Sequence, residues 1–165
     1  MDTPLPVQDS TNDTLDHIAR VHDYMRECAW IILNRGNEHD RSKLQEPEKS
    51  GFDRLMALKL SGMPYGSEEY RACLRAEKPA IDHHYAHNSH HAEHYPEGID
   101  GMCLFDLIEM LMDWKAASER MQNGGDIYWS LEHNIERFKI SPQLANILLN
   151  TIKRMEWKRP VANET

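Results

Sequence analysis

The sequence predicts an all-α fold, a compact single-domain bundle of about six to seven helices. Two observations lead to this prediction. Apolar residues recur at intervals of three and four over long stretches, as they do along one face of a helix. The alternation of apolar and polar residues that marks a half-buried strand never lasts more than a few residues, and glycine and proline fall between the periodic stretches.

The first predicted helix follows a polar, proline-containing lead of about twelve residues. Its apolar side carries Leu15, Ile18, Val21, Met25, Cys28 or Ala29, and Ile32. Gly36 is placed to end this helix. A second helix is expected to begin either at the His39-Asp40 pair or just after Glu46, with Pro47 near its first turn. Its inner side is predicted to carry Phe52, Leu55, Met56 and Leu60.

Shorter helices are expected in the middle of the chain. Glycine and proline in residues 62–66 break the second helix. Ser67 can cap a short helix through Leu74, and Pro79 can start another that carries the first histidines of a dense cluster. Proline and glycine over residues 96–101 mark the loop that follows.

The strongest helical pattern covers residues 102–122 and ends at the glycine pair 124–125. One side carries Leu104, Leu107, Ile108, Leu111, Lys115, Ser118 and Met121. Two shorter helices follow, one capped by Ser130 and the other by Ser141-Pro142. The apolar stripe of the last helix is Leu144, Ile147, Leu148 and Ile152.

Length and charge limit the class of protein. With 165 residues, of which 40% are hydrophobic, the chain suits one domain with a full core. We expect a flexible N-terminal lead over residues 1–12, a helical metal-binding domain over 13–157 and a tail over 158–165. The 19 lysines and arginines stand against 27 aspartates and glutamates, giving a net charge of −8 that opposes binding to duplex nucleic acid. A small phosphorylated ligand in a local pocket is compatible with this charge.

The cysteines and the N-terminus indicate a cytoplasmic protein. Cys28, Cys73 and Cys103 are odd in number, far apart and without a CxxC pair, which argues against a disulfide framework and a thiolate zinc site. The first residues have no basic and apolar leader, and no stretch approaches the roughly 18 apolar residues of a membrane span. A homo-oligomer is compatible with the sequence, which leaves the oligomeric state open.

Residues 83–94 are the most informative segment, because they hold six of the chain's ten histidines. Neutral imidazole is the commonest protein ligand for metals. A low-complexity histidine tract is the alternative, but such tracts usually lie at termini among glycine or serine. This segment lies mid-chain, contains Asn88 and Glu93 and precedes a strongly apolar segment. A metal site is therefore the first hypothesis.

Helical geometry would distribute the cluster over two neighbouring faces. One face would carry His83, His87, His90 and His94, and the other His84, Asn88 and His91. Two or three ligands are the usual contribution of one segment, so the other residues orient ligands, contact phosphate or lie at the surface. We favour His84 and one of His90 or His91 as metal ligands. Asn88 is expected to orient a neighbour or to touch substrate.

Further candidate ligands lie on both sides of the cluster. An adjacent His-Asp pair, His39-Asp40, offers one nitrogen and one carboxylate, and the two carboxylate oxygens can bridge two metal ions. His17 lies at the edge of the first apolar stripe, where a lone histidine is usually a core or boundary residue. Its order before the His-Asp pair, the cluster and a late Asp113 makes it a candidate ligand. Lys43 could supply the positive charge that a phosphate needs.

This order of ligands resembles that of the HD phosphohydrolase superfamily: a histidine on the first helix, a His-Asp pair, optional histidines and a late aspartate. The segment from His39 to Lys43 is similar to its His-Asp-x-x-Lys segment, in which the lysine lies near the substrate phosphate. A more specific resemblance, over roughly residues 15 to 120, is to an uncharacterised family of short phage and bacterial proteins, a domain of unknown function. Its three motifs, in order, match His39, Asp40, Ser42 and Lys43; His83, His84, Asn88, His90 and His91; and Glu109, Met110, Asp113 and Trp114. His87 and His94 fall outside the motifs and are poorer candidates as ligands.

The carboxylates of the helix over 102–122 are assigned with the help of this resemblance. Asp106, Glu109 and Asp113 share one face, and three carboxylates at this spacing are most often solvated. The late-aspartate position of the resemblance makes Asp113 a candidate ligand. Asp106 is expected to be exposed, and Glu109 to be a group behind the ligands or a general base.

The sequence thus predicts a metal-dependent phosphohydrolase of HD type, acting on a small phosphorylated molecule, with a nucleotide monoester or a phosphodiester such as a cyclic nucleotide as the favoured substrate. One or two ions would be held by His17, His39, Asp40, histidines of the cluster and Asp113. This mixed nitrogen and oxygen set suits Mn, Fe, Co, Ni or Zn better than Mg. Asp40, Lys43 and Glu109 are the catalytic candidates, Lys43 and Asn88 the substrate-binding ones, and Tyr65 or Tyr70 could stack on a base. The alternative is a non-catalytic helical module that sequesters a nucleotide or a protein partner and binds a metal that only stabilises its structure. The coordination of the metal separates the two, because a structural site is closed by protein ligands, whereas a catalytic one keeps room for water.

Overall fold

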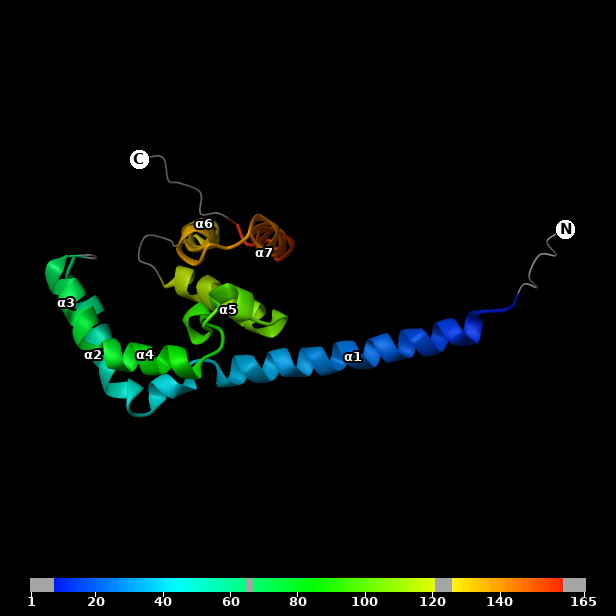
Figure 1. The fold of residues 1–165 in the computed structure, drawn as a ribbon, viewed down its shortest axis with the longest axis horizontal. Coiled ribbons are helices and arrows are strands. Elements are labelled where there is room, and N and C mark those ends of the chain that lie inside the picture. Colours follow the sequence, from blue (N-terminus) through cyan, green and yellow to red (C-terminus); the bar gives the residue numbers. More distant parts are fainter. Residues whose placement is uncertain (1–7, 65–66, 121–125, 159–165) are drawn as a thin grey trace. The chain divides into compact units, whose positions relative to one another are not determined.

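The computed structural model describes residues 8–64, 67–120 and 126–158, and over these ranges the chain is helical, without strands. Seven α-helices and three short 3-10 helices follow one another (Figure 1). The predicted all-α class and the number of helices are therefore confirmed. Contacts within the chain separate an N-terminal unit, Met1–Asn37, from a second unit, Glu38–Thr165. Among the described residues, none of the helices is long and apolar enough to cross a membrane.

The described part of the N-terminal unit is dominated by one long helix, α1, Thr11–Glu38. The backbone N–H and the hydroxyl of Thr11 both donate to Asp9 Oδ1, which marks the beginning of the helix. The prediction that Gly36 ends the helix is wrong. A glycine inside a helix costs only about 1 kcal/mol relative to alanine, so the helix continues past it to Glu38.

The second unit begins with a 3-10 helix, η1, Arg41–Leu44, and three α-helices. These are α2, Glu48–Leu60; α3, Glu68–Ala76; and α4, Lys78–His87. Of the two expected starts of the second helix, the one after Glu46 is confirmed. Ser67 caps α3 as predicted, because its hydroxyl oxygen accepts a hydrogen bond from Tyr70 N at 3.1 Å.

Helix α2 does not bury the side that its sequence suggests. Met56 is 51% and Leu60 77% exposed, whereas Gly51 and Leu58 are buried. The reason is the close approach of α4: a Cβ atom at Gly51 would overlap with the Cβ of Ala80. Only glycine at position 51 lets the two helices come this close, and the packing then decides which side of α2 faces inward.

The remaining elements form the hydrophobic core of the second unit. They are the 3-10 helices η2, Ala92–His94, and η3, Gly98–Gly101, and the helices α5, Leu104–Glu119; α6, Ile127–Phe138; and α7, Pro142–Arg154. Helix α6 contacts both α5 and α7. The buried core residues are Ala92, Ile99, Met110, Leu111, Ile127, Leu131, Ile140, Leu148 and Ile152.

One of the two predicted caps in this part is confirmed. Ser141 caps α7 by accepting a hydrogen bond from Leu144 N. The cap assigned to Ser130 is wrong, because the carboxylate of Asp126 accepts from Tyr128 N and starts α6 one turn earlier. The glycine pair 124–125 lies outside the described residues.

Helix α5 buries a carboxylate that the sequence analysis expected to be exposed. Asp106 is 2% exposed and Leu104 is 75% exposed, so the apolar stripe that begins at Leu104 is not the buried side. The Asp106 carboxylate accepts hydrogen bonds from Cys103 N, Ser89 Oγ and Tyr95 Oη at 2.9, 2.7 and 2.9 Å. These donors satisfy the charge and tie the histidine segment to the first turn of α5.

We expect Asp106→Asn to lower the free energy of unfolding by about 1–3 kcal/mol at neutral pH, because the amide nitrogen cannot accept these hydrogen bonds. Burial alone would raise the pKa of Asp106, but the hydrogen bonds from Cys103, Ser89 and Tyr95 outweigh it and hold the pKa below its usual range. A depressed folded-state pKa gives stability that is present above about pH 4 and is lost as the pH falls. Measured by urea unfolding, the free energy of unfolding of the wild type should approach that of Asp106→Asn as the pH falls from 7 to 3. Asp100→Asn is the control and should behave as wild type, because Asp100 is exposed. Parallel curves for the wild type and Asp106→Asn would contradict this role.

Candidate metal centre

The histidine segment is not one continuous helix, contrary to the expectation from its spacing. Helix α4 ends at His87, and Asn88 adopts an extended conformation. The Asn88 side-chain amide donates to His84 O at 2.8 Å and to Ser42 Oγ at 2.9 Å. These bonds fix the turn after α4, which returns His90 and His91 to the side of His84. Asn88 thus fixes the local backbone, and its expected contact with substrate stays a prediction.

Asp40 lies at the centre of the assembled side chains. Its backbone has a φ of 58°, in the left-handed region that aspartate tolerates better than most residues. Oxygen Oδ1 lies 3.3 Å from His84 Nε2 and 3.5 Å from His90 Nε2. Oxygen Oδ2 lies 3.5 Å from His39 Nε2 and 2.6 Å from Lys43 Nζ. The two oxygens thus face two different sets of nitrogen atoms.

The first set of candidate ligands combines Asp40 with His84, His90 and His91, whose potential ligand atoms all lie within 4.8 Å of one another. His84 Nε2 and His91 Nε2 are 2.9 Å apart. Asp40 Oδ1 and His90 Nε2 are buried and have no hydrogen-bond partner among the described residues. A buried polar atom without a partner is costly, and a cation held by these atoms would satisfy both. The donor set therefore fits a metal ion.

The second set combines Asp40 with His39 and Asp113. Asp113 Oδ1 lies 3.5 Å from His39 Nε2. Hydrogen bonds with Asp113 and Glu109 raise the pKa of His39 to about 10. Carboxylates at both nitrogens of the His39 ring therefore stabilise positive charge here, which a bound metal ion would supply in place of the proton on Nε2.

Electrostatics keep two ligands of the first set, His91 and Asp40, in the form that binds metal. Burial, together with the neighbouring His90 and His84, lowers the pKa of His91 to about 3, so its imidazole is neutral at neutral pH. Burial alone would raise the pKa of Asp40, but His84 and Lys43 outweigh it and hold the carboxyl ionised. Metal ligation requires a neutral histidine and an ionised carboxylate, and both are present.

Two glutamates orient the histidines from behind. Glu109 Oε1 lies 2.8 Å from His39 Nδ1 and 2.9 Å from His90 Nδ1. Glu48 Oε2 lies 2.9 Å from His84 Nδ1. A carboxylate that accepts from Nδ1–H leaves the lone pair on Nε2, the nitrogen that faces Asp40. These are hydrogen-bond distances, so Glu109 positions His39 and His90, and the three residues also form a third group of candidate metal ligands. The role of Glu109 as a general base stays a prediction.

The sequence analysis missed Glu48. Its side chain is 0% exposed, and it also bonds His83 Nδ1 and Ser42 Oγ, each at 2.8 Å. Pro47 places Glu48 in the first turn of α2, where acidic residues are common at the surface, so nothing in the local pattern distinguishes it. The sequence feature that could have pointed to Glu48 is Ser42, a residue of the His-Asp motif. In the structure the Ser42 hydroxyl donates a hydrogen bond to Glu48.

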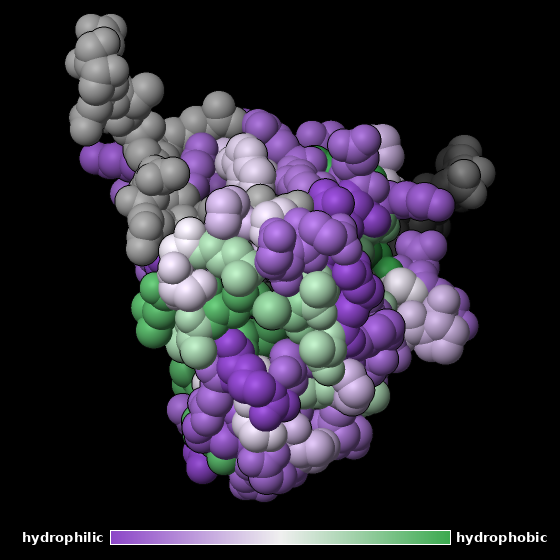
Figure 2. Space-filling model, turned by 90° about the vertical axis from the view of Figure 1, so that its left-hand side faces the viewer, coloured by the Kyte–Doolittle hydropathy of each residue, from purple (hydrophilic) through white to green (hydrophobic). Residues whose placement is uncertain are grey.

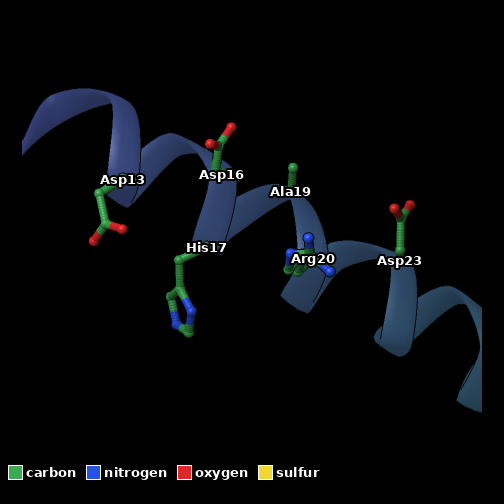
Figure 3. Close-up of a pocket in the computed structure, with 6 residues that line it drawn as sticks. All are labelled: Asp13, Asp16, His17, Ala19, Arg20 and Asp23. Carbon is green, nitrogen blue, oxygen red and sulfur yellow. The ribbon is translucent and has the colours of Figure 1, made fainter.

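Three other histidines of the sequence analysis are not members of these candidate ligand sets. The candidate ligand sets form without His17, which is exposed on α1 in the N-terminal unit. Figure 3 shows His17 and Asp13 on one side of this helix and Asp16 and Asp23 on the other, so these side chains do not converge. His87 is exposed, and His94 Nδ1 contacts Tyr85 O at 3.1 Å.

Fold and site together define a helical protein with a His/Asp/Glu cluster whose composition and spacing suit metal binding. Residues 7–154 match a protein family described as a family of unknown function (DUF5662), and the chain belongs to this family. The expected membership in an uncharacterised family is thereby confirmed. Neither a curated protein nor a solved structure matches the chain.

Proposed function

We propose that this protein is a metal-dependent phosphohydrolase of HD type, acting on a small phosphorylated substrate, with nucleotides as the favoured class. One observation carries the proposal: Asp40 presents one oxygen to His84 and His90 and the other to His39. A carboxylate placed in this way can bridge two metal ions, and paired ions are the usual device for cleaving phosphate esters.

The proposed ligands divide into two sets that share Asp40. His84, His90 and His91 hold one ion, and His39 and Asp113 hold the other. Three imidazole ligands on the first ion favour Mn, Fe, Co, Ni or Zn over Mg. Such ions lower the pKa of water and polarise phosphoryl oxygens, which is the chemistry that phosphate ester hydrolysis needs.

Lys43 supplies the positive charge for substrate in this proposal. Its ammonium donates to Asp40 Oδ2 at 2.6 Å and is partly exposed, with 30% of its side-chain surface accessible. A cation that takes this oxygen competes with Lys43, whose flexible side chain can then pair with a phosphate. The role fits the position of lysine in the His-Asp-x-x-Lys segment.

Metal analysis followed by a substrate screen tests the proposed function. The purified protein, supplemented with Mn, Fe, Co, Ni or Zn, should bind one or two equivalents and hydrolyse at least one nucleoside monophosphate or cyclic nucleotide. Less than about a tenth of an equivalent after supplementation would remove the metal site, because a well-built site fills when metal is offered. Bound metal without turnover of any phosphoester would favour the binding module. A thermal-shift stabilisation by an unhydrolysed nucleotide would then be its signature.

We expect Lys43→Ala to keep its metal content but to lower kcat/KM on the best phosphoester by at least about tenfold, which corresponds to about 1.4 kcal/mol of transition-state stabilisation. Lys49→Ala is the matched control, because Lys49 is on α2 and pairs with Asp53 at the surface. Elemental analysis and steady-state kinetics measure the two quantities. An unchanged kcat/KM in Lys43→Ala would make Lys43 a partner of Asp40 only.

A further inference from the structure

A pocket of about 430 Å³ opens beside the candidate metal centre and shares Asp40 and Lys43 with it. Its walls come from α2 and α3 and include Phe52, Leu55, Tyr70 and Leu74. Figure 2 shows the face of the second unit on which α2 and α3 lie in Figure 1, where hydrophobic residues gather in the middle and hydrophilic ones surround them. The pocket therefore joins an apolar surface to a polar centre.

Phe52 connects the two parts. Lys43 Nζ lies 4.8 Å from the centre of the Phe52 ring, and the His84 ring meets Phe52 edge-on at 5.4 Å between centroids. The same lysine thus touches Asp40 on one side and the pocket wall on the other. A phosphoester whose phosphate pairs with Lys43 can therefore place its organic group along this wall.

We infer that the pocket is the specificity site of the enzyme and holds a flat, largely apolar organic group, such as the base of a nucleoside monophosphate. The inference rests on the proposed function. Five of the lining residues are apolar, and a volume of a few hundred Å³ with apolar walls and some polar groups is typical of small-molecule sites. Phe52 and Tyr70 line the pocket with aromatic rings, and stacking on an aromatic side chain stabilises a bound base whatever its identity.

The charges that line the pocket fit the same class of ligand. Exposed Lys59 and Arg120 add two cations, and Asp53, which pairs with Lys49, is the one carboxylate besides Asp40 among the described residues that line the pocket. A phosphorylated ligand with further anionic or hydroxyl groups matches this balance. A sugar phosphate or a short alkyl phosphate would leave the apolar walls in water and gain nothing from them. The structure thus favours nucleoside phosphates over these compounds. Tyr70, one of the two predicted stacking residues, lines the pocket, whereas Tyr65 lies outside the described residues.

The test compares a variant that fills the pocket with one that adds the same side chain outside it. Leu74→Trp places an indole in the pocket, and Ala72→Trp places it on the exposed side of the same helix. Metal-loaded proteins are assayed with AMP, CMP and methyl phosphate. We expect Leu74→Trp to lower kcat/KM for both nucleotides at least about tenfold, in line with the stacking energy. Its metal content and its kcat/KM for methyl phosphate should stay within about twofold of wild type, and Ala72→Trp should match wild type throughout.

Binding of adenosine and cytidine, which carry no phosphate, separates this inference from the proposed function. Calorimetric titration should detect binding of at least one nucleoside to wild type and to Ala72→Trp, and none to Leu74→Trp. Binding without hydrolysis of any phosphoester would overturn the hydrolase and keep the pocket. If Leu74→Trp hydrolyses both nucleotides and methyl phosphate with the same kcat/KM as the wild type, the assignment of the pocket as specificity site is wrong and the proposed hydrolase function stands. Tyr70→Ala replaces Leu74→Trp if the latter does not fold, and the same loss on nucleotides alone is expected.

Discussion

Replacement of Asp40 by asparagine is expected to remove the bound metal and, with it, all hydrolysis. The amide has one oxygen instead of two and carries no charge, so it cannot face His84 and His90 with one ligand atom and His39 with another. Its NH2 group would place hydrogen atoms where one ion is to bind. Asparagine is the informative substitution because it tolerates the left-handed backbone of residue 40, whereas alanine would add strain there.

The measurement is the metal content after loading and desalting, with circular dichroism to verify folding. Asp82→Asn is the matched control, since Asp82 lies exposed on α4 and pairs with Lys78. His94→Ala should also retain metal, because His94 contacts a backbone carbonyl and not the cluster. Full metal content in Asp40→Asn would refute the central role of Asp40. Equal losses in Asp40→Asn and His94→Ala would show that the ligand assignment is wrong.

The fold class follows from sequence periodicity, but which side of each helix faces inward does not. The helical periodicity of apolar residues, with glycine and proline between the periodic stretches, predicted where the helices lie. Caps such as Ser67 and Ser141 could be recognised because a serine before a helix accepts a backbone hydrogen bond from its first turn. The inner side of α2 depends on Gly51 and Ala80, which are far apart in the chain. The burial of Asp106 likewise depends on donors from Ser89 and Tyr95. Tertiary partners of this kind are not encoded in local spacing.

The site was predicted from motifs and not from geometry. The structure brings together His39, Asp40, Lys43, His84, Asn88, His90, His91, Glu109 and Asp113, all of which the sequence analysis named. Helical spacing alone would have grouped His83 with His87, His90 and His94, because it assumed that α4 continues. The helix ends where the amide of Asn88 bonds Ser42, 46 residues earlier in the chain. The order of family motifs predicts that these distant segments come together. It does not include residues such as Glu48, which lie between the motifs.

The missed residue gives the second large effect: we expect Glu48→Gln to weaken metal binding by about 10–100-fold, the usual loss when a carboxylate behind a histidine ligand is removed. Glu48 accepts hydrogen bonds from Ser42, His83 and His84 through two oxygens and has no exposed surface. Glutamine keeps one oxygen and turns the other position into a donor. If that donor faces His84 Nδ1, the ring must carry its proton on Nε2, which removes the lone pair that faces Asp40.

Competition with a chelator of known affinity measures the loss of metal affinity. Glu46→Gln is the matched control, because Glu46 is exposed and its carboxylate accepts a hydrogen bond from Ser50. Urea unfolding of the metal-free proteins provides the second readout, since a buried amide facing N–H donors should also cost about 1–3 kcal/mol. The two readouts separate the roles of Glu48. Reduced stability with unchanged metal affinity would make Glu48 a structural partner of α4. A loss of affinity larger than in Glu46→Gln, in a variant that still folds, would show that Glu48 acts on the metal through the orientation of His84.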